Sequence, residues 1–349
     1  SGSVHRVIGF DADRGALRRA ASRVAITEAA STPADLVAEA TIVVLATPVG
    51  AIPDAYRLIA PHLKPGTIVT DLGSAKARMV AEIGPLVPPG TSFIGGHPLA
   101  GAETEGIDSA EPGLYRGAFW ILTPTEATDP GAYGRLVRFL GTLGVHVLSL
   151  QPARHDELVA LTSHLPQLLS SALMGFAADL SSAEGGLPLI AAGGFRDMTR
   201  VAASSTELWL GIIRENRPAV LAVLERFQEA LGDMAGAIGS QDWDRLRSLL
   251  DAAREGRDRL PERPGLVPAA PVTLLVPVED RTGVLAEVVI PPTEAGVSIA
   301  GVAIVDAPEG GRGWVRLVIN GEEPARRAFE ALELRGFSPV LAPPPGASA

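Results

Sequence analysis

The chain has 349 residues, of which 46% are hydrophobic and 20% charged, so it can bury a large core in two or three domains. Its net charge of -10 argues against nucleic acid or an anionic membrane as a partner, because both attract basic surfaces. The absence of cysteine excludes disulfides, thiolate metal sites and cysteine nucleophiles. No apolar run reaches the roughly 18 residues of a membrane span. We therefore expect a cytoplasmic protein without a metal site.

The N-terminal residues predict one strand and one helix of a nucleotide-binding α/β domain. Residues 4–10 form an apolar run that predicts a short buried strand ending in Asp11, and residues 14–22 predict a helix. A carboxylate at such a strand end typically accepts hydrogen bonds from the adenosine ribose of a dinucleotide. The alternative is that Asp11 caps the following helix and binds no ligand.

Further apolar runs continue this domain, which we place at residues 1–151. The run at 41–48 predicts a strand whose end, Thr47 and Pro48, meets the cofactor. The next run ends in Asp71, which we also assign to cofactor binding. The remaining predicted strands lie at residues 68–71, 92–95, 118–123 and 145–150.

No Gly-x-Gly-x-x-Gly loop precedes Asp11, although a dinucleotide-binding fold usually opens with a strand, that loop and a helix. The first strand of such a fold lies in the middle of the sheet, so its loss would leave two unpaired strand edges. We therefore expect that a strand-helix unit of about 30 residues is missing from the sequence as given.

A glycine-flanked histidine is the most informative feature of the chain. Gly95-Gly96-His97-Pro98 follows the apolar residues 92–94, which predicts a loop in which the imidazole faces a ligand. A histidine-proline pair is more often a structural turn when it stands alone. Three further segments accompany it: Asp71-Leu72-Gly73-Ser74-Ala75-Lys76, Ser163-His164-Leu165-Pro166, and the run Gly193 to Arg200.

These four segments, in this order, resemble the prephenate/arogenate dehydrogenase family of tyrosine biosynthesis. The resemblance covers most of the chain. It implies an NAD-dependent oxidoreductase that oxidatively decarboxylates prephenate to 4-hydroxyphenylpyruvate, with arogenate as the alternative substrate. It also implies a nucleotide-binding domain, a helical dimerisation domain and a small regulatory domain.

The resemblance assigns the chemistry to two residues. His97 would accept the proton of the ring hydroxyl as hydride leaves the adjacent carbon. Ser74 would orient the hydroxyl and the imidazole. The alternative for Ser74 is an N-cap for a helix that starts at Ala75, and both roles can coexist.

Arg200 is the candidate for a substrate carboxylate, because a guanidinium binds a carboxylate through two parallel hydrogen bonds. Its alternative is a surface salt bridge. Trp209 would wall the pocket or belong to the core, and His164 is equally a core histidine bonded to a backbone carbonyl or a ligand contact. The family also suggests that Glu103 and Asp197 form a polar gate over the pocket. It suggests two further substrate contacts, Gly193 and Gln167, the latter in place of a second histidine.

Residues 152–260 show apolar positions at three- and four-residue spacing, which predicts an all-helical domain. Two helices are expected, one through His155 to Leu168 and one through Ala219 to Ile238. So much apolar helix surface favours an intertwined homodimer, and a compact monomeric bundle is the alternative.

Residues 261–271 are rich in proline and charge, which is typical of a linker. Residues 272–343 predict the order βαββαβ, which resembles the ACT regulatory domain. That resemblance implies that free tyrosine, as a feedback ligand, binds at the first strand-helix loop: Asp280, Thr282, Gly283, Val284 and Leu285. A purely structural turn is the alternative for Gly283.

Two other classes of protein remain open. A dehydrogenase of the β-hydroxyacid or pyrroline-carboxylate type would share the architecture but lack the His97 segment and the C-terminal domain. A non-catalytic amino-acid sensor would explain the lack of the glycine loop, but it would not need Ser74, His97 and Arg200 together.

Overall fold

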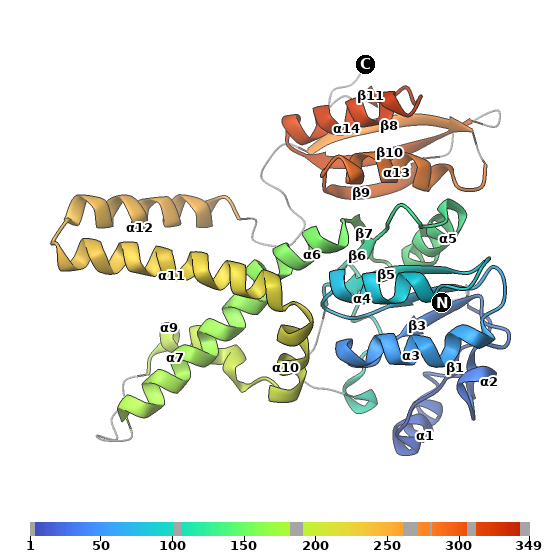
Figure 1. Ribbon diagram of the computed structural model, residues 1–349, viewed down its shortest axis with the longest axis horizontal. Coiled ribbons are helices and arrows are strands. Elements are labelled where there is room, and N and C mark those ends of the chain that lie inside the picture. The colour runs from blue at the N-terminus through green and yellow to red at the C-terminus, as the bar shows by residue number, and fades with distance from the viewer. Residues whose placement is uncertain are drawn as a thin grey trace. The chain divides into compact units, whose positions relative to one another are not determined.

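The computed structural model describes residues 4–100, 106–181, 191–260, 271–279, 281–305 and 312–342. The chain forms two compact units (Figure 1). The first unit comprises residues 1–47, 51–152 and 259–349, and the second comprises residues 48–50 and 153–258.

The first unit is built on five strands from the predicted nucleotide-binding domain. β3, β4 and β5 are parallel, β6 runs antiparallel to β5, and β7 is parallel to β6. β3 and β4 consist largely of β-branched residues, which suit strands that are covered on both faces. The bounds are β3 (Ile42–Leu45), β4 (Ile68–Asp71), β5 (Ser92–Pro98), β6 (Phe119–Thr123) and β7 (His146–Ser149).

Helices connect these strands. The α-helices are α3 (Ile52–Ile59), α4 (Ala77–Ile83) and α5 (Pro130–Gly141), and short 3₁₀ turns lie at η1 (Val49–Ala51), η2 (Ala60–His62), η3 (Gly84–Leu86) and η4 (Ile107–Ser109). The nucleotide-binding α/β architecture predicted from the sequence is confirmed.

The strand that carries His97 is longer than expected. The sequence predicts that it ends at Gly95 and that His97 lies in a loop, but β5 continues to Pro98. The continuation pairs with β6, with Gly95 opposite Thr123 and His97 opposite Ile121. The prediction of a loop is therefore wrong, because antiparallel pairing outweighs the tendency of glycine and proline to end a strand.

The N-terminal strand is shorter and less buried than predicted. β1 (Ile8–Gly9) pairs only with β2 (Glu28–Ala29) in a separate two-stranded sheet, and Val7 is 41% exposed. A cavity of about 690 Å³ lies between residues 4–8 and 41–44, so the free edges of β1 and β3 both border it. The expected pair of unpaired edges is thus present among the described strands. The accompanying helices are α1 (Arg14–Ser22) and α2 (Pro33–Val37).

The C-terminal part of the first unit has the predicted order βαββαβ. Its antiparallel strands lie in the order β11-β8-β10-β9, and its two helices pack against each other. Of the predicted linker, residues 261–270 lie outside the described part of the chain. The elements are β8 (Pro271–Glu279), α13 (Val284–Glu294), β9 (Ile299–Val305), β10 (Arg312–Asn320), α14 (Glu322–Leu334) and β11 (Val340–Leu341).

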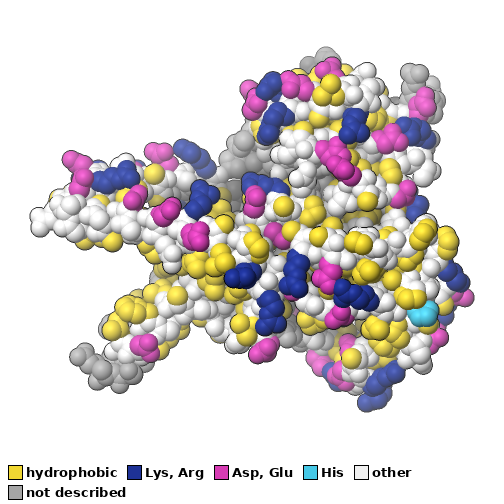
Figure 2. Space-filling model, in the orientation of Figure 1, with side chains coloured by type: hydrophobic (Ala, Val, Ile, Leu, Met, Phe, Trp, Pro, Cys, Tyr) yellow, Lys and Arg dark blue, Asp and Glu magenta, His cyan; other side chains and the backbone are white. Residues whose placement is uncertain are grey.

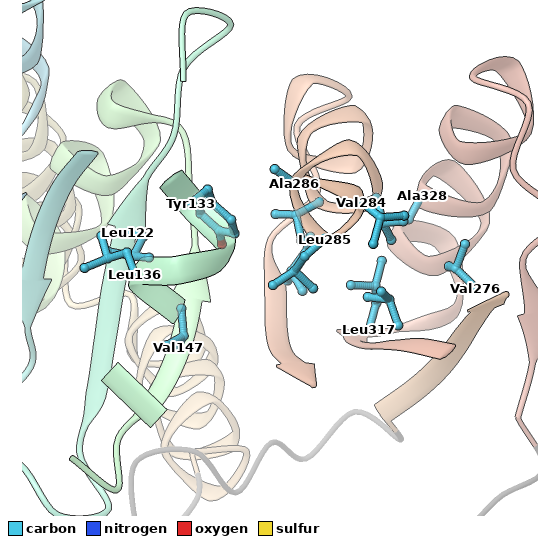
Figure 3. Close-up of a cluster of buried hydrophobic side chains, with 14 of the residues drawn as sticks. Leu122, Tyr133, Leu136, Val147, Val276, Val284, Leu285, Ala286, Leu317 and Ala328 are labelled. Carbon is cyan, nitrogen blue, oxygen red and sulfur yellow. The ribbon is translucent and has the colours of Figure 1, made fainter. Parts of the chain in front are cut away.

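One buried hydrophobic cluster spans the first unit. It combines residues of α5 and β7, such as Tyr133 and Val147, with Leu285 of α13 and Leu317 of β10 (Figure 3). A single backbone pair, Ser149 with Ile299, also joins β7 to β9. The described C-terminal elements therefore share a core with α5 and β7.

The second unit is entirely helical in its described residues, as predicted. A π-helical turn, η5 (Ala160–His164), interrupts the long helix predicted from His155. The other elements are α6 (Pro152–Val159), α7 (Leu165–Ser181), α9 (Gly193–Thr199), η6 (Arg200–Ala203), α10 (Thr206–Glu215), α11 (Arg217–Gly239) and α12 (Trp243–Asp258).

These helices expose much of their apolar surface. Within α11 the buried residues are Val220 and Ala237, and α12 buries none. Hydrophobic side chains gather along α7 and α11 (Figure 2), including Phe176, Leu231 and Ile238, each at least half exposed. This exposure favours the predicted homodimer over the alternative of a compact monomeric bundle. Among the described helices, none is both long and apolar enough to cross a membrane.

Candidate active site

One buried carboxylate joins the two segments that carry Ser74 and His97. Asp71 ends β4 and has no exposed surface. Its Oδ2 accepts a hydrogen bond from the backbone nitrogen of Gly73 at 2.8 Å, and its Oδ1 accepts one from Gly96 at 2.9 Å. Gly73 directly precedes Ser74, and Gly96 directly precedes His97. The backbone next to each of these half-buried residues, Ser74 and His97, is therefore hydrogen-bonded to the same Asp71 side chain.

Lys76 is a residue of this site that the sequence reasoning missed. Its side chain is fully buried and its Nζ forms an ion pair with Oδ2 of Asp71. Lys76 is also the N-cap residue of α4, which begins at Ala77 and receives no side-chain cap. The alternative role of Ser74 as the N-cap of a helix starting at Ala75 is therefore wrong, since the backbone is still non-helical at Lys76.

The two glycines before His97 allow β5 to pack closely against its neighbouring strands, β4 and β6. A Cβ atom on Gly96 would lie 2.6 Å from the carbonyl oxygen of Asp71 and 2.7 Å from Oγ1 of Thr70. A Cβ on Gly95 would collide with Oγ1 of Thr123. The close approach that the sequence suggested for a ligand is thus made here by the neighbouring strands.

The residues predicted to bind the cofactor differ in exposure. Asp11 is exposed at the carboxyl end of β1, where an acceptor fits the ribose of a dinucleotide. The N-cap of α1 is Asp13, whose side chain accepts from Gly15, so the alternative of Asp11 as the cap is wrong. Thr47 and Pro48 follow β3 and are exposed. Asp71, in contrast, is buried and holds three donors.

A buried polar group lies in the second unit around His164, which is 1% exposed. The amide nitrogen of Asn216 contacts Nδ1 of His164 at 3.2 Å and donates to the carbonyl oxygen of Asp156 at 2.9 Å. Burial lowers the pKa of His164 to about 4, so the ring is neutral at neutral pH. Because the amide donates to Nδ1, the ring proton lies on Nε2.

This group bears on the alternatives for two residues. His164 is buried, as a core histidine would be, but its partner is the Asn216 side chain rather than a backbone carbonyl. Trp209 is half-buried and meets the His164 ring edge-on, with ring centroids 6.0 Å apart and planes at 81°. No local sequence pattern points to Asn216, which lies 52 positions from His164.

The remaining predicted substrate residues of the second unit lie at its surface, apart from one. Arg200 is exposed at the start of η6, and Gly193 and Asp197 are exposed on α9. Gln167 is 5% exposed, and its amide nitrogen lies 3.4 Å from Oγ of Ser171. Glu103, the proposed partner of Asp197 in a gate, lies outside the described residues.

The predicted regulatory loop contacts the core of the first unit. Gly283 caps α13 with a φ of 95°, a left-handed conformation that favours glycine. A Cβ atom at this position would lie 3.1 Å from Cβ of Pro130, at the start of α5. Thr282 is exposed, whereas Val284 and Leu285 are buried. Asp280 lies outside the described residues, and those described contain no cluster of three metal-binding side chains.

Family models match both parts of the chain that carry these residues. The model for the prephenate dehydrogenase nucleotide-binding domain matches residues 1–149, and the model for the prephenate dehydrogenase dimerization domain matches residues 151–252. A prephenate dehydrogenase of Bacillus subtilis is 30% identical over 335 residues, which cover 95% of this chain and 89% of that protein.

Solved structures of similar proteins agree with these matches. The arogenate dehydrogenase of Synechocystis is 35% identical, with a TM-score of 0.65 over 73% of this chain and 91% of that one. The prephenate dehydrogenase of A. aeolicus, in complex with hydroxyphenyl propionate and NAD+, is 28% identical, with a TM-score of 0.69 over 74% of this chain and 90% of that one.

Proposed function

The chain belongs to the prephenate dehydrogenase family, and from that premise we propose that His97 and Ser74 carry out its chemistry. It is an NAD-dependent oxidoreductase that converts prephenate to 4-hydroxyphenylpyruvate in tyrosine biosynthesis. The observation that supports the assignment of these two residues is their common anchor. Both follow a backbone amide that donates to Asp71.

NAD supplies the hydride acceptor for this reaction. His97 accepts the proton of the ring hydroxyl while hydride leaves the carbon that bears it. The ring carboxylate then departs as carbon dioxide, and its bonding electrons make the ring aromatic. Ser74 holds the hydroxyl and the imidazole in line, and Arg200 binds a substrate carboxylate.

Arogenate is a second candidate substrate, because the arogenate dehydrogenase of Synechocystis is 35% identical to this chain. The two compounds differ in a side-chain keto or amino group. Turnover of each with NAD, measured side by side, decides between them.

Asp11 supports a preference for NAD over NADP. Its exposed carboxylate accepts ribose hydroxyls and repels a 2′-phosphate, a difference worth about 1–3 kcal/mol. We expect kcat/KM to be at least about tenfold higher with NAD than with NADP. Asp11→Asn should reduce this ratio, whereas Asp13→Asn, which keeps a capping side chain two residues away, should leave it unchanged. Equal kcat/KM values with the two cofactors would contradict the role of Asp11.

The exposed apolar faces of α7 and α11 support a homodimer as the working form. Two copies of the chain would bury these faces against each other. The match of residues 151–252 to a dimerization domain agrees with this proposal.

The described C-terminal elements support an ACT-like regulatory domain. Their strand order, with a strand-helix-strand unit repeated twice, is that of a ferredoxin-like fold. The tyrosine ligand would bind at the loop of Thr282 and Gly283. Because this loop lies against Pro130 of α5, a ligand bound at the loop would act directly on a helix of the nucleotide-binding domain.

A variant at Gly283 tests the regulatory proposal. We expect tyrosine to inhibit the parent enzyme, and Gly283→Ala to raise the tyrosine concentration for half-inhibition by at least about fivefold. Alanine is strained at a φ of 95° and crowds Pro130. The matched control is Gly296→Ala, which bears the same kind of backbone strain at a φ of 72° in open space. Unchanged inhibition in both variants would place the tyrosine site elsewhere.

A further inference from the structure

A fully buried ion pair lies at the carboxyl end of β4. Neither Asp71 nor Lys76 has any exposed side-chain surface. Moving two charges out of water costs several kcal/mol for each ion, and such a pair often adds no more stability than apolar residues of the same size. Stability alone therefore does not explain why the charges lie here.

The carboxylate of Asp71 is fully occupied by protein donors. Its oxygens accept the amides of Gly73 and Gly96 and bind the ammonium group of Lys76. This arrangement leaves no exposed oxygen for a cofactor, so the geometry does not support the cofactor contact predicted for Asp71 from the sequence. The hydrogen bonds of Asp71 instead connect its side chain to the two segments that carry Ser74 and His97.

Lys76 supplies the counter-charge for this connection. Its ammonium group pairs with Oδ2 of Asp71, the oxygen that also accepts the amide of Gly73, while Oδ1 accepts the amide of Gly96. Charge-assisted hydrogen bonds are stronger than neutral ones. Both amides are then held at once.

The backbone around His97 has little freedom to compensate. The absent side chains of Gly95 and Gly96 let β5 lie against Thr123 and Thr70 more closely than a Cβ atom would allow. The amide of Gly96 therefore reaches the carboxylate only in this tight register. Loss of the carboxylate would leave that amide buried without its acceptor.

We propose that Asp71, paired with Lys76, is the positioning residue that places His97 and Ser74 in their reactive arrangement. This inference rests on the proposed function, because it takes His97 and Ser74 as the residues that touch the substrate. Asp71 acts only through the backbone that leads to them. Displacements of about 1 Å at a reacting group can cost a hundredfold in rate, so the effect belongs in kcat.

The test is Asp71→Asn in the full chain. Asparagine is similar in shape but its NH₂ group cannot accept the second amide. We expect kcat to fall at least tenfold, while KM for prephenate and Kd for NAD stay within about twofold. Because Asp71→Asn leaves the Lys76 charge unpaired, the double variant Asp71→Asn/Lys76→Met, which buries no charge, should be measured with it and should show the same loss of kcat.

Tyr133→Phe is the matched control. It also removes a polar atom from a buried hydrogen bond, between Tyr133 and Ser149, but in a part of the first unit outside the proposed site. Its kcat should stay within twofold of the parent even if its melting temperature falls. A loss of kcat in this control equal to that in Asp71→Asn would overturn the proposal, because it would show general sensitivity to buried substitutions.

Two other results would overturn it. The first is a folded single or double variant with a kcat within threefold of the parent. The second is a loss of rate that disappears at saturating NAD, which would make Asp71 a cofactor contact. If His97→Asn itself kept normal turnover, the proposed function would fail; if His97→Asn lost turnover and Asp71→Asn kept it, only the positioning role would fail.

Discussion

Replacing His97 with asparagine should lower kcat by at least about a hundredfold and leave KM for prephenate nearly unchanged. In the proposed mechanism the imidazole accepts the hydroxyl proton in the transition state, and a base of this kind contributes roughly 10²–10⁴-fold in rate. Asparagine can still hydrogen-bond the hydroxyl in the ground state but cannot take its proton. The loss therefore falls on the transition state, which a steady-state measurement of kcat and KM separates from binding.

The matched control for this variant is His146→Asn. His146 is an exposed residue of β7 whose ring lies beside Phe119, so its replacement should leave kcat unchanged. Thermal melts of the three proteins establish that they are equally folded at the assay temperature. Near-normal turnover of a folded His97→Asn enzyme would remove His97 from the role of base.

Arg200→Ala should do the reverse and raise KM for prephenate by about a hundredfold with a small change in kcat. A guanidinium that binds a carboxylate through two charged hydrogen bonds contributes ground-state and transition-state binding alike, and about 3 kcal/mol corresponds to that factor. Arg200→Lys keeps the charge but not the paired geometry, so its KM should lie between those of the parent and the alanine variant.

Arg196 offers the control for Arg200. It lies on the preceding helix, α9, and its Nε donates to the carbonyl oxygen of Ala191. Arg196→Ala removes the same charge four positions away, so it should leave KM within about twofold. If Arg196→Ala raised KM as much as Arg200→Ala, general electrostatic attraction would explain both effects. If neither did, Arg200 would revert to the role of a surface cation.

The elements that the sequence predicted well are those whose signal is local. β3 and β4 are continuous apolar runs, and α11 repeats apolar residues over 23 positions. The C-terminal order βαββαβ is also as predicted, and Gly283 and Gly321 each precede one of its helices. In these segments composition and periodicity point to the same structure.

The features that the sequence did not predict depend on partners far along the chain. β5 runs through two glycines and a proline because it pairs with β6, whose residues lie 22 to 28 positions further along the chain. α4 starts at Ala77 because Lys76 turns inward to Asp71, a contact at five-residue spacing that no helix face produces. The hydrogen bond between Asn216 and His164 likewise has no local pattern.

The lack of side chains at Gly95 and Gly96 limits which substitutions beside His97 could change the substrate range of this enzyme. Any side chain at these positions collides with Thr123 or with the carbonyl of Asp71, so selection has almost no variants to choose from beside His97. The exposed residues of α9, such as Gly193 and Asp197, carry no such restriction. Because Gly193 and Asp197 are predicted to contact the substrate, saturation libraries for other cyclohexadienyl acids are better aimed at α9. The residues of β5 beside His97 should be left unchanged.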